Sequence, residues 1–243
     1  LDSYIDDIRK HADPNIRSRT ESCFRAIPRM LANENKRFMY SDVESDGPDR
    51  GYRLGSKYYE PAMDWLSMAN ISLTCNRVSE PHLPLEERSS DSLFKLYMID
   101  TGLLASLYDP STFSEILKGN TDVNMGAIAE NAVAVAFSLQ GRIPFYYSSI
   151  EPRREVDFVT PVGGKACAVE VKSGENRRCR SLNDVMNRYG IGGIMFETRN
   201  VFVDDKGVRH YPLFAASFMD SIDPVSSPTE DFSDLEEIGR EYS

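Results

Sequence analysis

The chain has 243 residues, of which 41% are hydrophobic, so it can bury a core in one large domain or two modest ones. It contains no apolar run long enough to cross a bilayer, and its polar, acidic start lacks a signal peptide, so we expect no membrane partner. The four cysteines stand far apart without a Cys-x-x-Cys motif. This spacing argues against structural zinc and a disulfide framework, and favours a reducing, cytoplasmic setting.

The net charge of −10 is unevenly distributed along the chain. Residues 220–243 contain eight acidic residues and one basic residue, whereas residues 142–199 contain ten basic and seven acidic residues. We therefore expect residues 221–243 to form an acidic, disordered tail. Because the part before the tail is mildly basic, the overall charge does not exclude a nucleic-acid partner.

The first predicted region, residues 1–110, combines helices with a two-stranded ribbon. Helical spacing of apolar residues predicts helices over 18–33 and 57–69. Alternating residues predict strands over 71–78 and 94–99, and Asp100 then caps a short helix. Helices followed by such a ribbon predict an N-terminal winged-helix-like module.

DNA reading by this module is only one of two interpretations. The helix in the recognition position, residues 57–64, carries two acidic residues and Pro61. Helices that read bases usually present Arg, Lys, Asn or Gln. We therefore favour a contact between domains or with another protein over DNA reading.

The second predicted region, residues 111–220, begins with a buried helix. Residues 125–140 are apolar almost all round, and Gly141 ends the helix at its C′ position. Glu130 and Asn131 are the polar exceptions, and a buried carboxylate is costly unless it is paired or bound to a metal. Further strands are expected at 143–147, on both sides of Gly163-Gly164, and at 191–196, 200–203 and 208–211, with a helix at 182–189. This order predicts a mixed sheet with flanking helices, and hence an α+β fold.

Two strands joined by Gly163-Gly164 carry the most informative residues. A two-residue Gly-Gly turn pairs residues whose numbers sum to 327, so Asp157 lies opposite Glu170 and Glu155 opposite Lys172. Strict alternation would place all four side chains on one face of the hairpin. Opposed carboxylates repel each other and are tolerated when a positive charge lies between them, usually a divalent metal ion.

The pattern formed by Glu130, Asp157 and Glu170-x-Lys172 resembles the PD-(D/E)XK nuclease superfamily. The resemblance implies a restriction-endonuclease-like mixed-sheet domain and catalytic roles for Asp157, Glu170 and Lys172. It also implies that Glu130, Asp157 and Glu170 hold Mg²⁺ or Mn²⁺. Hydrolysis of a phosphodiester requires this kind of charge stabilisation. Tyr189 matches part of a Gln-x-x-x-Tyr motif of some relatives, but Val185 replaces the Gln.

Three segments are similar to those of a narrower family, prokaryotic AAA+ superfamily ATPases with an uncharacterised C-terminal domain. They are residues 91–104, residues 126–131 (Gly-Ala-Ile-Ala-Glu-Asn) and residues 155–158 (Glu-Val-Asp-Phe). The chain has no Gly-x-x-x-x-Gly-Lys-[Ser/Thr] phosphate loop and does not begin with Met. The resemblance therefore implies that the ATPase part belongs to a longer protein and that this chain does not bind ATP.

Three arginines follow the Glu-x-Lys strand closely. Arg177, Arg178 and Arg180 suit a phosphate clamp that binds nucleic acid, or equally a solvated loop before the next helix.

The function expected from the sequence is Mg²⁺-dependent cleavage of DNA, as the effector part of an AAA+ ATPase. The alternative is a non-catalytic module of the same ATPase that binds DNA, forms homo-oligomers or regulates. A third interpretation is a structural domain for protein contacts. The residues alone do not decide among these, because a fold does not fix a function.

Overall fold

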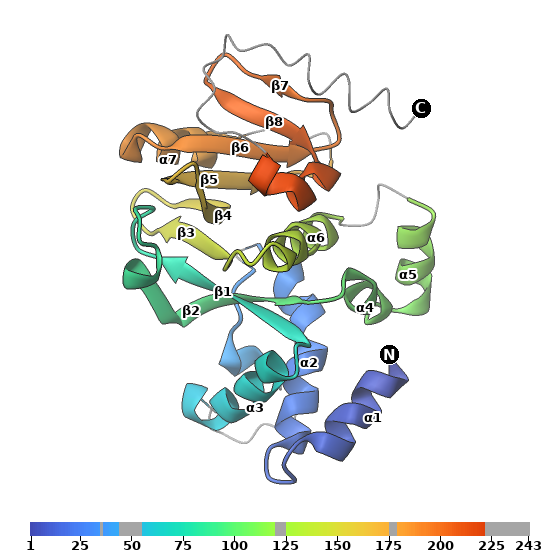
Figure 1. The fold of residues 1–243 in the computed structure, drawn as a ribbon. Helices are drawn as coiled ribbons and strands as arrows, with labels where there is room; N and C mark the ends of the chain where they lie inside the picture. The colour runs from blue at the N-terminus through green and yellow to red at the C-terminus, as the bar shows by residue number, and fades with distance from the viewer. Residues whose placement is uncertain (35, 44–54, 120–124, 175–178, 222–243) are drawn as a thin grey trace.

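The computed structural model describes residues 1–34, 36–43, 55–119, 125–174 and 179–221 (Figure 1). The α-helices of this part are α1 Asp2–His11, α2 Arg17–Ala32, α3 Ser56–Met68, α4 Thr101–Ser106, α5 Pro110–Leu117, α6 Gly126–Leu139 and α7 Arg180–Tyr189. The strands are β1 Ser72–Val78, β2 Ser89–Met98, β3 Phe145–Ser149, β4 Arg154–Val162, β5 Lys165–Val171, β6 Gly192–Glu197, β7 Phe202–Val203 and β8 Val208–Pro212. The 3₁₀ helices are η1 Tyr40–Asp42, η2 Glu86–Arg88 and η3 Leu213–Ser221. The expected acidic tail lies outside the described residues, except for Ser221.

All of these strands belong to one mixed sheet with the order β2-β1-β3-β4-β5-β6-β8-β7. The β1–β3, β5–β6 and β6–β8 pairs are parallel, and the other neighbours are antiparallel. The predicted α+β class with a mixed sheet and flanking helices is therefore confirmed.

The sheet is buried on both faces. Ile194 and Met195 are neighbours on β6, yet Ile194 packs into the core that contains Phe137 of α6, and Met195 into the core that contains Val185 of α7. Because side chains alternate along a strand, α6 and α7 cover opposite faces of the sheet.

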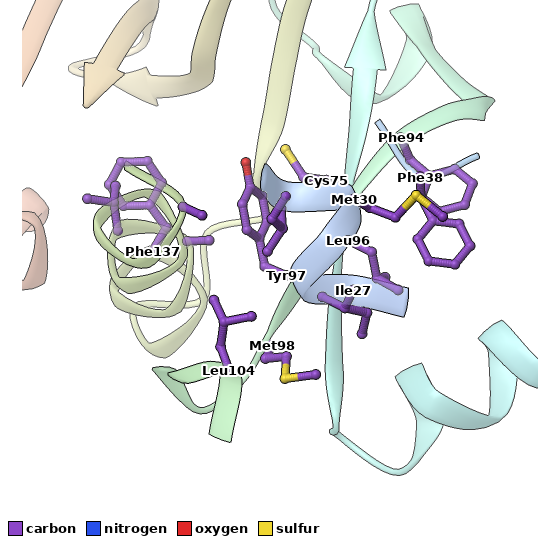
Figure 2. Close-up of a cluster of buried hydrophobic side chains, with 14 of the residues drawn as sticks. Ile27, Met30, Phe38, Cys75, Phe94, Leu96, Tyr97, Met98, Leu104 and Phe137 are labelled. Carbon is purple, nitrogen blue, oxygen red and sulfur yellow. The ribbon is translucent and has the colours of Figure 1, made fainter. Parts of the chain in front are cut away.

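The core on the α6 side extends from the first predicted region into the second. Phe38 and Phe94 stack with ring centroids 5.7 Å apart, and Phe137 meets Phe158 edge to face at 5.5 Å. Figure 2 shows Tyr97 between the Phe38–Phe94 pair and Phe137. This continuous apolar contact fixes the β1–β2 ribbon against α6.

The β1–β2 ribbon is not a free wing. Residues Asn76 to Val78 of β1 pair in parallel with Phe145 to Tyr147 of β3, so the ribbon extends the main sheet. Its second strand begins at Ser89, five residues before the predicted start at Phe94. The winged-helix arrangement is not confirmed, and the division between residues 110 and 111 stays a prediction.

The hairpin register is confirmed close to the turn. Phe158 pairs with Val169 and Val162 with Lys165, as the sum of 327 requires. Gly163 and Gly164 have φ angles of +55° and +74°, a left-handed conformation that favours glycine in a two-residue turn. The predicted pairing therefore holds from the turn to Phe158.

Beyond Phe158, β4 departs from strict alternation. Phe145 and Tyr147 of β3 pair with Val159 and Val156 of β4, so β4 carries one extra residue at this point. Val156 and Val159 both pack on the α7 side, whereas Phe158 packs on the α6 side. Such a bulge redirects side chains, so the expectation that four charged residues share one face is corrected.

Two helices have no counterpart among the predicted elements. α1 places Ile5 and Ile8 in the core. α5 begins after Asp109, whose carboxylate accepts hydrogen bonds from the N–H groups of Ser111 and Thr112. An Asp followed by Pro is a recognisable start signal for a helix. The predicted cap of α4 by Asp100 is confirmed by its bonds to the backbone of Gly102 and Leu103.

Candidate functional site: a buried cluster of lysines and carboxylates

Glu130 lies at the centre of a buried charged cluster. Its side chain on α6 is fully buried. The carboxylate accepts hydrogen bonds from Lys36, from the hydroxyl of Tyr97 and from Lys95, whose Nζ lies 3.1 Å from Oε1. All three donors belong to the first predicted region of the chain, so Glu130 connects the two regions by charge-assisted hydrogen bonds.

Lys95 is the cation on which most of the cluster converges. The side chain is fully buried in β2. Its Nζ lies 3.0 Å from Glu155, 3.1 Å from Glu130 and 3.9 Å from Asp157, and sits 4.9 Å from the ring centroid of Tyr146. A buried ammonium is tolerated only with such compensation.

Asp157 is held between the lysines and the next strand. Its Oδ1 lies 3.7 Å from Nζ of Lys36 and 3.9 Å from Nζ of Lys95. Its Oδ2 accepts a hydrogen bond of 2.9 Å from the backbone N–H of Val171. Asp157, which lies at the bulge of β4, therefore binds the backbone of β5 through its side chain.

The mutual attraction of these charges shifts their pKa values more than burial does, and in the opposite direction. Burial by itself lowers the pKa of Lys95, but Glu130, Glu155 and Asp157 raise this pKa well above its usual value. Burial likewise lowers the pKa of Lys36, and Asp157 and Glu130 raise it further than burial lowers it. Burial raises the pKa of Asp157, yet Lys36 and Lys95 bring it below its ordinary value. The lysines and Asp157 are therefore charged at neutral pH.

Glu170 and Lys172 form a neighbouring pair. Lys172 Nζ lies 2.6 Å from Oε1 of Glu170. The other oxygen, Oε2, is buried and has no hydrogen-bond partner among the described residues. Burial first, and then the nearby Asp157, raise the pKa of Glu170 to about 8. Glu170 is therefore mainly protonated at pH 7, unlike an ordinary carboxylate.

The carboxylates do not form a metal-binding group in this arrangement. Lysines and Tyr97 already occupy the oxygens of Glu130, and one oxygen of Asp157 accepts from the backbone. In the part of the chain that the structure describes, no three His, Cys, Asp or Glu side chains converge so that they could hold a metal ion. The positive charge that the sequence led us to expect is supplied here by ammonium groups.

The predicted site residues fall into two neighbouring sets. Glu130 and Asp157 share Lys36 and Lys95, while Glu170 pairs with Lys172. Glu155 pairs with Lys95 rather than with the predicted partner Lys172, because the bulge changes the direction of β4.

The predicted phosphate clamp is described only in part. Arg177 and Arg178 lie outside the described residues. Arg180 is exposed at the start of α7, with Nε 3.9 Å from Asp184. Its binding role stays a prediction.

The sequence interpretation missed the two lysines. Lys95 did carry a signal, since it interrupts an otherwise apolar run from Leu93 to Met98. A charged residue within a buried strand requires a partner. Lys36 lies in a short connection after α2 and has no comparable signal.

Two family models match the chain. Residues 1–114 match a domain of unknown function, DUF8612, and residues 125–212 match a second domain of unknown function, DUF4143. Each match covers less than half of the chain. The DUF4143 match is consistent with the link to AAA+ ATPases, because that domain is found in AAA-ATPase-associated proteins.

No curated protein and no solved structure matches the chain. Among the described residues, the helices are too short or too polar to cross a membrane.

Replacing Lys95 with Met tests the cluster. The variant leaves the buried carboxylates of Glu130 and Asp157 without one of the cations that they share, so we expect the free energy of unfolding to fall by about 3–5 kcal/mol. The matched control is Lys118→Met, which removes an exposed pair with Glu115 and should cost about 0–1 kcal/mol. Urea denaturation measures both. Adding Glu130→Gln to Lys95→Met should restore part of the lost unfolding free energy. Equally small losses of unfolding free energy in Lys95→Met and Lys118→Met would contradict the role of Lys95 in the buried cluster.

Glu170 should make stability depend on pH. Its pKa is 4.5 when unperturbed and about 8 in the folded chain. Its stabilising contribution is therefore complete below pH 4.5 and is lost as the pH rises through 8. Glu170→Gln mimics the protonated form, so its unfolding free energy relative to wild type should increase from pH 5 to pH 9. The increase should reach several kcal/mol, because one pKa unit is worth about 1.4 kcal/mol.

The control for this titration is Glu87→Gln, which changes an exposed carboxylate. Chemical denaturation at each pH gives the difference between variant and wild type. Parallel pH profiles for wild type and Glu170→Gln would contradict the raised pKa of Glu170.

Proposed function

We propose that this chain is a non-catalytic regulatory module of an AAA+ ATPase, in which lysines fill the place of a metal centre. The observation that carries the proposal is the full burial of Glu130 with three donors from the other predicted region. A group enclosed in this way has no oxygen available for a substrate or a cation.

The charge balance of the cluster supports this proposal. With Glu170 protonated below a pH of about 8, the two neighbouring sets together hold three carboxylates and three ammonium groups. These groups are Glu130, Glu155 and Asp157 with Lys36, Lys95 and Lys172. A balanced cluster offers little attraction to a divalent cation, which binds where carboxylate charge is in excess.

The position of the cluster supports a regulatory role. Lys36 and Lys95 come from one matched segment, whereas the carboxylates and Lys172 come from the other. A displacement of either segment therefore separates buried charges. Such separation is costly, which makes the cluster a two-state element of the kind that couples distant parts of a protein. DNA binding or homo-oligomerisation of the module would be the event that changes the rate of ATP hydrolysis.

A second candidate function is hydrolysis of DNA with Mg²⁺ or Mn²⁺. The buried Oε2 of Glu170, which lacks a partner among the described residues, favours it. The ligands would be Glu130, Asp157 and Glu170, with Lys172 as the third catalytic residue beside Asp157 and Glu170. This function requires Lys36 to leave Glu130 and Asp157, since its ammonium group occupies the space between them.

Cleavage and metal assays on the full chain separate the two candidates. We expect neither saturable Mn²⁺ binding by calorimetry nor cleavage of plasmid or single-stranded DNA with Mg²⁺ or Mn²⁺. Wild type, Asp157→Ala and Lys172→Ala are compared with Lys118→Ala, which changes an exposed lysine. Cleavage by wild type and Lys118→Ala that is lost in Lys172→Ala would overturn the proposal and establish the nuclease.

The regulatory role is tested in the longer protein that the ATPase resemblance implies. There, Lys36→Met removes a largely buried cation of the cluster and should change the ATP hydrolysis rate several-fold, whereas Lys118→Met should not. The rate is measured by phosphate release. Equal rates in wild type and a folded Lys36→Met variant would count against regulation.

A further inference from the structure

A hollow of about 280 Å³ opens beside the charged cluster. Its lining includes Arg37, Arg153, Arg154, Ser148 and Ser149, together with Ile150 and Glu155. Glu155 also belongs to the cluster, and Arg37 directly follows Lys36. The hollow therefore adjoins the cluster and shares Glu155 with it.

The charge of the lining is positive. It contains three guanidinium groups and one carboxylate, and that carboxylate, Glu155, is paired with Lys95 at 3.0 Å. A further guanidinium approaches from β1, where Arg77 donates to the backbone oxygen of Ser148 at 2.9 Å. The hydroxyl of Ser148 is a neutral donor, whereas the hydroxyl of Ser149 already donates to the backbone oxygen of Pro152 at 2.6 Å.

The arginines differ in how firmly they are held. Arg37 donates to the hydroxyl of Ser148 at 3.0 Å, and Arg154 is tied to Asp184. Arg153 is 68% exposed and lies 3.5 Å from Glu34, which is 85% exposed. Exposed pairs of this kind contribute little, so the guanidinium of Arg153 can turn toward a ligand while Arg37 and Arg154 are already positioned.

Asp184 connects the hollow to the predicted clamp. Its carboxylate lies between Arg154 and Arg180. Arg180, which the sequence suggested for phosphate binding, thus shares the Asp184 carboxylate with Arg154, which lines the hollow.

We propose that this hollow binds a phosphate group. Guanidinium groups donate paired hydrogen bonds to phosphate oxygens, and a combination of arginines with the Ser148 hydroxyl suits an oxyanion. The phosphate can belong to a nucleic-acid backbone or to a free nucleotide or inorganic phosphate. Only for the nucleic-acid source does the inference rest on the proposed function.

The test is fluorescence anisotropy of the full chain with a labelled single-stranded 20-mer DNA, with inorganic phosphate and a nucleoside monophosphate as competitors. Arg37→Gln and Arg153→Gln should each weaken binding about tenfold. Each should also reduce the slope of log K against log salt by about 0.7 for the DNA. Arg25→Gln, an exposed arginine on α2, is the matched control and should bind as wild type.

The outcomes are distinguishable. DNA binding that falls in both hollow variants supports the phosphate site and its nucleic-acid source. Binding of phosphate or mononucleotide alone, measured by calorimetry and lost in the same variants, supports the site and rejects the nucleic-acid source, leaving the regulatory proposal intact. No binding of any probe, or binding unchanged in Arg153→Gln, whose exposed side chain leaves the fold unaffected, overturns the inference.

Discussion

The buried ion pair between Lys95 and Glu130 is the constraint on which the arrangement of this chain depends. Both side chains are fully buried, and neither could remain charged there alone. Their pairing requires β2 and α6 to lie close together, which in turn sets the position of the β1–β2 ribbon against the rest of the sheet. The aromatic contacts of Tyr97 and Phe137 with Phe158 then close the apolar core around the pair.

Local signals in the sequence predicted much of the secondary structure. The Gly163-Gly164 turn and its register, the cap at Asp100 and the apolar helix around Glu130 follow from interactions between near neighbours in the chain. The bulge in β4 could not be predicted in this way, because pairing with β3 produces it and no residue within β4 marks it. The same holds for the union of the ribbon with β3, which joins residues far apart in sequence.

The sequence predicted the negatively charged residues of the candidate site but not the positively charged residues Lys36 and Lys95. Glu130 was recognised because a carboxylate in apolar surroundings requires compensation, and Asp157 and Glu170 were recognised because opposed carboxylates repel each other. The same reasoning applied to Lys95 in its apolar strand would have found the compensating charge. Electrostatic repulsion thus predicted that a cation is present, but the spacing of the carboxylates could not distinguish a metal ion from an ammonium group supplied by a distant segment.

The parallel pairing of β1 with β3 has a consequence for how this chain can be divided. The two family matches separate between these strands. A cut there would leave each piece with an open sheet edge whose N–H and C=O groups lack partners, and would expose the aromatic core between β2 and α6. The two segments complete one sheet and one core, so either segment transplanted alone would carry an aggregation-prone edge into its new context.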